Sequence, residues 1–189
     1  MPSYIFLGIL FFIPYSLGFQ PDLSWRFMVM VLMTTFLIPL MGVLLLNFTK
    51  NISNLNMEIR RERFIPFFFN SLFYMATTYL FWEKFRFPPL VNYVMVSITF
   101  SIVLLTIITL FWKISAHAIA VSGATGIYFA LLFQTESSNL YMGLALCFAL
   151  CGLVASARLK LLVHSVSQVW AGLALGFLIN FLTILILNR

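Results

Sequence analysis

The chain has 189 residues, of which 62% are hydrophobic and 8% are charged, whereas soluble domains average about 45–50% apolar and about 25% charged residues. This composition excludes a soluble globular domain, a disordered chain and a nucleic-acid-binding module, and it predicts a membrane protein. The formal charge of +6 is then assigned to the ends of membrane spans, where Lys and Arg report orientation or bind lipid head groups.

Seven apolar runs follow one another along the chain. They cover residues 3–18, 27–48, 65–82, 91–112, 118–133, 140–155 and 169–187, and a polar interruption over residues 156–168 precedes the last. Because backbone groups in lipid must be hydrogen-bonded internally, these runs should be helices. The sequence therefore predicts an all-α, polytopic helical membrane protein, with six to seven transmembrane helices in one bundle and residues 1–189 as a single domain.

The cations are divided unequally between the two sides of the predicted bundle. One side has four, which are Arg26, Lys84, Arg86 and Arg189. The other side has seven, which are Lys50, Arg60, Arg61, Arg63, Lys113, Arg158 and Lys160. The excess of cations is typical of a cytoplasmic side. The same seven include every candidate for binding a phosphate, so the orientation stays open.

Small residues inside the apolar runs predict close helix packing. Gly172 and Gly176 form a GxxxG pattern in the last run, and small residues let membrane helices approach one another closely. Packing within the chain is the first interpretation, with a homodimer face as the alternative. Cys147 and Cys151 lie four residues apart in one run, where a disulfide has poor geometry, so they are interpreted as packing residues.

The two histidines of the chain, His117 and His164, both lie on the seven-cation side at the entrance of a predicted helix. Ionisable groups at a membrane edge are costly, which makes them hypotheses of function. If the last helix begins near Val163, His164 and Gln168 share a helix face one turn apart, and the Gln168 amide could orient the imidazole. Arg158 lies one short loop away, and a guanidinium beside a histidine suits a phosphate group.

A third basic cluster contains Arg60, Arg61 and Arg63. Two spans separate this cluster from His117, and two more separate His117 from His164, so all three should reach one membrane face. The alternatives are ordinary cytoplasmic anchors for the arginines and a satisfied polar role for each histidine. We expect no cofactor and no metal, because two histidines without a nearby carboxylate pair make a poor metal site.

The C-terminal part of the chain, residues 113–187, resembles the type 2 phosphatidic acid phosphatase superfamily of membrane lipid phosphatases. The second motif of that superfamily is Pro-Ser-Gly-His, and the third is Ser-Arg, five residues, His, three residues, Asp. The matching segments here are Ile114-Ser115-Ala116-His117 and Ala157-Arg158 followed by His164 and Gln168. Residues 60–66 and 112–117 also look like a small bacterial membrane branch of the superfamily.

The resemblance implies a role for each matching residue. His164 would be the nucleophile that forms a phosphohistidine, and His117 the general acid for the leaving alcohol. Arg158 and Ser115 would hold the phosphoryl oxygens. The first motif of the superfamily has no clean match, and Lys113, Arg60 and Arg63 are the candidates to supply its cations. Gln168 replaces the Asp that orients the nucleophile, and Ala157 replaces the Ser of the third motif.

Two functions follow as alternatives. The first is an integral membrane phosphatase that hydrolyses a lipid phosphate or polyprenyl diphosphate. The second is a catalytically inactive relative that binds phospholipid head groups or serves as a subunit of a membrane complex. A transporter with a carboxylate proton relay is disfavoured, because no carboxylate lies within a span. The expected location is the bacterial inner (cytoplasmic) membrane, because outer-membrane proteins are β-barrels.

Overall fold

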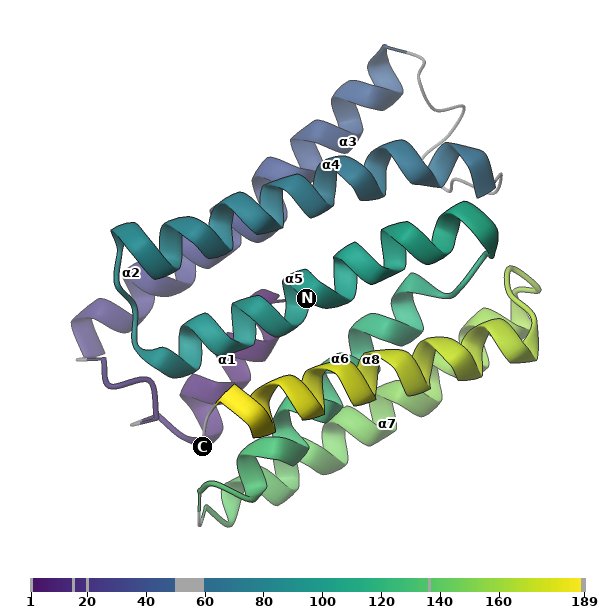
Figure 1. Ribbon diagram of the computed structural model, residues 1–189. Helices are drawn as coiled ribbons and strands as arrows, with labels where there is room; N and C mark the ends of the chain where they lie inside the picture. The colour runs from purple at the N-terminus through teal and green to yellow at the C-terminus, as the bar shows by residue number, and fades with distance from the viewer. Residues whose placement is uncertain (1, 15, 20, 50–59, 136, 188–189) are drawn as a thin grey trace.

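The computed structural model describes residues 2–14, 16–19, 21–49, 60–135 and 137–187, and every regular element within them is helical (Figure 1). The all-α prediction is therefore confirmed for this part of the chain. Lys50 and Arg189, two of the cations counted above, lie outside it, as do the side chains of Arg60 and Arg61.

In chain order the elements are α1 (Pro2–Phe12), α2 (Pro21–Leu32), the π-helical turn η1 (Met33–Leu37), α3 (Ile38–Phe48), α4 (Arg60–Tyr79), the π-helical turn η2 (Leu80–Lys84), α5 (Pro89–Phe111), α6 (Ala116–Leu132), α7 (Asn139–Lys160) and α8 (Val166–Leu187).

Five helical segments of the described chain are long and apolar enough to cross a membrane. They are Leu23–Phe48, Glu62–Lys84, Pro89–Phe111, Asn139–Lys160 and Val166–Leu187. The helices α1 and α6 are apolar but shorter, with 11 and 17 residues. At 1.5 Å per residue α6 is about 25 Å long, slightly less than the roughly 30 Å of a hydrocarbon core. The composition and these five segments together make the chain a helical membrane protein.

The helix α6 lies among α5, α7 and α8, and its most extensive contact is with α8. Glycines bring the two backbones together. A Cβ atom on Gly172 would lie 2.9 Å from the Ser115 carbonyl oxygen. One on Gly176 would overlap the Ile119 carbonyl oxygen and the Ser122 hydroxyl. The GxxxG pattern therefore packs against α6 of the same chain, and this contact fixes the start of α8 beside the start of α6.

Adding a single methyl group to Gly176 is expected to destabilise the protein. The Gly176→Ala variant forces apart two packed backbones, and overpacking of this kind costs about 1–3 kcal/mol. The measurement is the thermal unfolding temperature of the purified protein in detergent.

Gly152→Ala on α7 is the matched control, since no other side chain or neighbouring backbone lies within 4 Å of its Cβ position. It should be neutral or slightly stabilising, because alanine is the better helix former. Equal unfolding temperatures for the two variants would contradict the packing role of Gly176.

Polar side chains also join the helices, which is an effective way to hold helices together in lipid. The Ser71 and Thr106 hydroxyls lie 2.8 Å apart between α4 and α5. The Asn180 amide on α8 donates to the Ser101 hydroxyl on α5 at 2.8 Å. The bundle is thus held by polar contacts as well as by its apolar surface.

Several predicted boundaries were wrong. The helix α1 ends at Phe12 and not near residue 18, and α2 begins at Pro21 and not near residue 27. The sequence predicted a polar interruption over residues 156–168, but α7 continues to Lys160 and α8 begins at Val166. Ala157 and Leu159 are good helix formers, and cations are stabilising in the last turn of a helix. Leu162 then adopts a left-handed conformation with φ of 54°, which is a common way for a helix to end. Arg158 is therefore a residue of the last turn of α7 and not of a loop.

Candidate functional site

Three parts of the chain meet at one end of the bundle (Figure 1). They are the start of α4, the connection from α5 to α6, and the connection from α7 to α8. These parts carry Arg63, His117 and His164 respectively. The alternation of spans had predicted that all three reach one face, and the helix ends lie together in this arrangement.

His164 is held by two acceptors at the same ring nitrogen. Its Nδ1 lies 3.2 Å from the Lys113 carbonyl oxygen and 3.1 Å from Gln168 Oε1. The side chain is buried, with 9% of its surface exposed. Because both partners are oxygen acceptors, Nδ1 must carry the proton when the imidazole is neutral. The lone pair is then on Nε2, which is the atom able to act as a nucleophile.

The orientation of the Gln168 amide is fixed by the start of α8. The backbone N–H of Ser165 donates to Gln168 Oε1 at 3.2 Å, and the backbone N–H of Gln168 donates to the Ser165 hydroxyl at 3.4 Å. This reciprocal pair is a capping box. Gln168 Oε1 therefore accepts from Ser165 and faces His164 at the same time. Ser165 was missed by the sequence reasoning, although Ser165-Val166-Ser167-Gln168 matches the capping-box signature.

Ser115 connects the two helix starts. Its hydroxyl caps α6 by accepting from the backbone N–H of Ala118 at 3.3 Å, and its own backbone N–H donates to the Gln168 carbonyl at 3.4 Å. The side chain is fully buried. These two contacts give Ser115 a structural role, because they hold the start of α6, which carries His117, beside the start of α8.

His117 lies at the second position of α6 and is exposed. Electrostatic interactions link it to Arg158, His164 and Arg63. Arg63 and Arg158 also act on each other as like charges. Residues from α4, α6, α7 and the α7–α8 connection are therefore close enough to interact, and together they form a region of positive charge.

Arg158 has an unsatisfied donor. Its Nε is buried and has no hydrogen-bond partner within the described part of the chain. A buried donor without a partner costs about 1–3 kcal/mol. An anion at this position would satisfy the donor, and guanidinium groups suit phosphate oxygens in particular.

The surroundings of His164 favour the neutral form of its imidazole. Burial lowers the pKa of His164 below its ordinary value of 6.5, and the charges of Arg63 and Lys113 act in the same direction. The hydrogen bonds to Gln168 and to the Lys113 carbonyl oppose this shift but do not reverse it. Lys113 thus contributes both a backbone acceptor and a cation beside the imidazole.

The remaining candidates take different positions. Arg60 is the first residue of α4, and its side chain lies outside the described residues. Arg63 lies in the first turn of α4 and is half-buried. Among the described residues no group of three or more His, Cys, Asp and Glu side chains is placed to hold a metal ion.

Comparison of the chain with protein-family models, with curated proteins and with solved structures finds no match. The chemistry available at the site is set by its contents. An oriented imidazole lies in one electrostatic cluster with a second imidazole, two guanidinium groups and an ammonium group. Such a cluster attracts an anion and offers it a nucleophilic nitrogen.

Proposed function

We propose that the protein is an integral membrane phosphatase that hydrolyses a lipid phosphate or a polyprenyl diphosphate through a phosphohistidine. The observation that carries the proposal is the double contact of His164 Nδ1 with the Lys113 carbonyl and Gln168 Oε1. This contact leaves the Nε2 lone pair for attack on phosphorus. A covalent intermediate divides one difficult displacement into two easier steps.

In the first step, His164 Nε2 attacks phosphorus, and the bond from phosphorus to the leaving oxygen breaks with its electron pair on that oxygen. The bound anionic substrate favours the protonated form of His117, and His117 then donates this proton to the leaving alcohol or phosphate. In the second step, a water molecule attacks the phosphohistidine and gives a proton to His117, and the N–P bond breaks to release inorganic phosphate. His164 Nδ1 keeps its proton throughout, because its two acceptors hold it there.

The cations at this end of the bundle have a direct role in the proposed reaction. Arg158 offers a buried, unsatisfied Nε–H, and Arg63 and Lys113 add positive charge near the histidines. Fixed cations stabilise the charge of a transferring phosphoryl group. Residues 113–187, which resemble the type 2 phosphatidic acid phosphatase superfamily, contain most of these groups and form the proposed catalytic core. The role of Arg60 in this set remains part of the proposal.

The proposed setting is the bacterial inner membrane, crossed six to seven times by one bundle. We assign five crossings to the five long segments and a sixth to α6, because α5, α7 and α8 pack against it. The apolar helix α1 is the candidate for a seventh. Membrane lipids surround this bundle and supply the substrate, and a homodimer or larger complex is compatible with it.

The test is phosphate release by the purified protein. Phosphatidate, phosphatidylglycerol phosphate and a polyprenyl diphosphate are presented in mixed micelles, and inorganic phosphate is measured over time. Release from at least one of these lipids supports the phosphatase. Saturable binding of the same lipids without release would instead support the inactive relative, which the neutral Gln168 in place of a carboxylate favours. If the protein neither releases phosphate nor binds any of these lipids, the proposed phosphate site is overturned.

The pH dependence of release should follow the ionisation of His164. Activity needs the neutral imidazole, and burial lowers the pKa of His164, so the rate should fall on the acid side only below about pH 6.5. A carboxylate in place of the amide would raise that pKa and stabilise the cationic phosphohistidine. Gln168→Glu should therefore move the acid limb to higher pH and raise the plateau rate about tenfold, because charge-assisted hydrogen bonds are stronger by about 1–1.5 kcal/mol. An acid limb that this substitution does not move would contradict the role of Gln168.

A further inference from the structure

An apolar groove leads away from the candidate site along α7. It lies between α1, α6 and α7 and has a volume of about 410 Å³, which is within the usual range for ligand pockets of about 300–1,000 Å³. Its side is open where Tyr4, Leu146 and Leu150 are exposed, with 75%, 54% and 52% of their surfaces accessible. In a membrane protein this opening faces the surrounding lipid.

On both α6 and α7, helical register places a residue of the cationic site one turn beyond the groove. On α6 the lining residues Val121, Ala124 and Tyr128 continue the helical face that begins at His117. On α7 the lining residues Gly143, Cys147, Leu150 and Val154 continue the face that ends at Arg158. Residues three and four positions apart share a helix face. His117 and Arg158 therefore each lie one turn, about 5.4 Å, beyond the near end of the groove.

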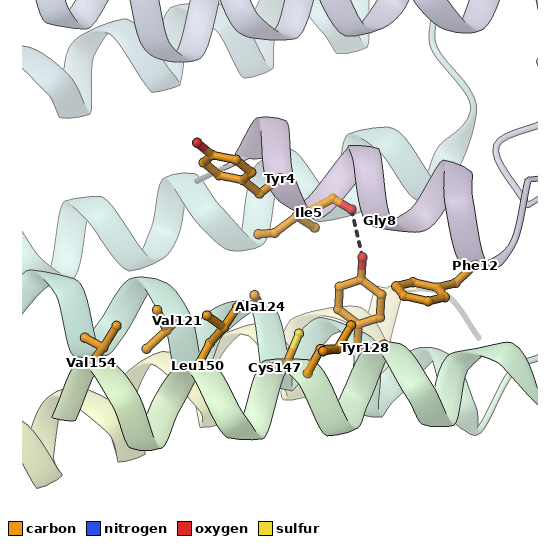
Figure 2. A pocket seen from close by; sticks show the side chains of 12 residues that line it. Tyr4, Ile5, Gly8, Phe12, Val121, Ala124, Tyr128, Cys147, Leu150 and Val154 are labelled. Carbon is orange, nitrogen blue, oxygen red and sulfur yellow. Dashed lines mark hydrogen bonds between the residues drawn. The ribbon is translucent and has the colours of Figure 1, made fainter. Parts of the chain in front are cut away.

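The far end of the groove is closed by aromatic side chains (Figure 2). Figure 2 shows Val154 and Val121 at one end, and Tyr128 and Phe12 at the other. The rings of Phe12 and Tyr128 meet edge to face at 6.3 Å, and a Cβ atom on Gly143 would lie 2.9 Å from the Phe12 ring. The Tyr128 hydroxyl donates to the Ile5 carbonyl at 3.1 Å, which holds α1 over this end.

The length of the groove matches one leaflet. From Val154 to Gly143 the helix rises about 16 Å at 1.5 Å per residue, and half of a hydrocarbon core is about 15 Å. Lipid tails are as apolar as the groove, so a chain gains little hydrophobic energy by entering it. Selection of a chain must therefore depend on its fit to the groove and on the anionic head group at its end.

We propose that this groove holds the apolar chain of a phosphate-bearing lipid whose head group lies at His117 and Arg158, and that Phe12 and Tyr128 limit the chain length. The inference rests on the proposed phosphate site. The groove is then the chain subsite of the phosphate site, and the substrate is a lipid with a chain about one leaflet long. The charge of the site complements the head group, and the groove begins one helical turn from it.

The test uses a probe that the enzyme cannot hydrolyse. A single-chain alkylphosphonate with a diazirine near the end of its chain is added to the full-length protein in phosphatidylcholine vesicles. After photolysis, labelled residues are mapped by mass spectrometry. The same chain ending in an alcohol measures labelling without a charged head group. We expect the phosphonate to label Phe12 and residues 143–147, and the alcohol to lose most of this labelling.

Two tryptophan variants on α7 locate the chain. Leu150→Trp should fill the groove and abolish labelling beyond it. Leu153→Trp is the matched control, because Leu153 is also an exposed leucine of α7 but does not line the groove, and labelling should persist. Both positions are exposed to lipid, so both variants should fold.

Equal labelling by phosphonate and alcohol, or labelling that Leu150→Trp leaves unchanged, would overturn the groove as a chain subsite. Phosphate release by the wild-type protein is measured in parallel. Specific labelling without release would overturn the proposed catalysis and leave the subsite intact. Release without specific labelling would overturn the subsite and leave the catalysis intact.

Discussion

Replacing His164 with alanine is expected to reduce phosphate release by about 10³-fold or more, because the proposed covalent route loses its nucleophile. His164 is the proposed nucleophile, and the Lys113 carbonyl and Gln168 Oε1 fix the tautomer of its imidazole. Initial rates with the best substrate, at lipid concentrations above saturation, give the comparison. An alanine variant as active as the wild type across all lipids tested would contradict the phosphohistidine mechanism.

The alanine variant also removes a buried side chain, so a second variant is needed to separate chemistry from folding. In His164→Asn, the amide N–H can take the place of Nδ1–H and donate to the Lys113 carbonyl, but no atom replaces the Nε2 lone pair. We expect an unfolding temperature close to that of the wild type together with the same loss of release. If this asparagine variant keeps its activity, phosphate release depends on the hydrogen bond to the Lys113 carbonyl and not on the Nε2 lone pair.

The helical membrane fold could be predicted from composition and hydropathy because lipid leaves the backbone few alternatives. The predicted runs locate the helices of the described chain, but their ends were less accurate. The end of α7 was predicted too early because Ser156, Arg158 and Lys160 are polar, although they continue the helix. Polarity marks where a span leaves the hydrocarbon, whereas the helix ends where the backbone turns at Leu162.

The candidate site could be anticipated only in part. The alternation of spans predicted a shared end for Arg63, His117 and His164, and the four-residue spacing predicted the contact of His164 with Gln168, which is 3.1 Å long. The contact with the Lys113 carbonyl could not be predicted, because it depends on how closely α8 approaches α6. The distance between α6 and α8 is set where Gly172 and Gly176 pack against residues 115–122 of α6. The spacing of the two glycines does not show which helix they will contact.

Replacing Arg158 with alanine is expected to reduce phosphate release by about 10²-fold or more. Its buried Nε has no hydrogen-bond partner among the described residues, so its strongest interaction in the proposed reaction is with the phosphoryl group. Removing one such donor from a transition state costs about 10²–10³-fold in rate. Arg158→Lys should recover only part of the loss, because an ammonium keeps the charge but not the planar pair of donors.

Lys160→Ala is the matched control for Arg158→Ala. Both residues lie in the last turn of α7, where each cation stabilises the helix carboxyl terminus to a similar extent. A general effect of charge on α7 or on attraction of anionic lipid would therefore appear in both variants, and equal losses would contradict a specific phosphate contact.

The two site variants together separate catalysis from binding. A phosphatase requires both side chains for release, but only Arg158 for a large share of its affinity, because His164 acts mainly in the chemical step. An inactive relative would lose lipid-phosphate binding in Arg158→Ala, keep it in His164→Asn, and show no release in any form. The neutral Gln168 beside His164 is compatible with either behaviour, since it orients the ring in both. Lipid binding and phosphate release are therefore measured for the wild type, Arg158→Ala and His164→Asn. The activities that each variant loses distinguish the phosphatase from the inactive relative.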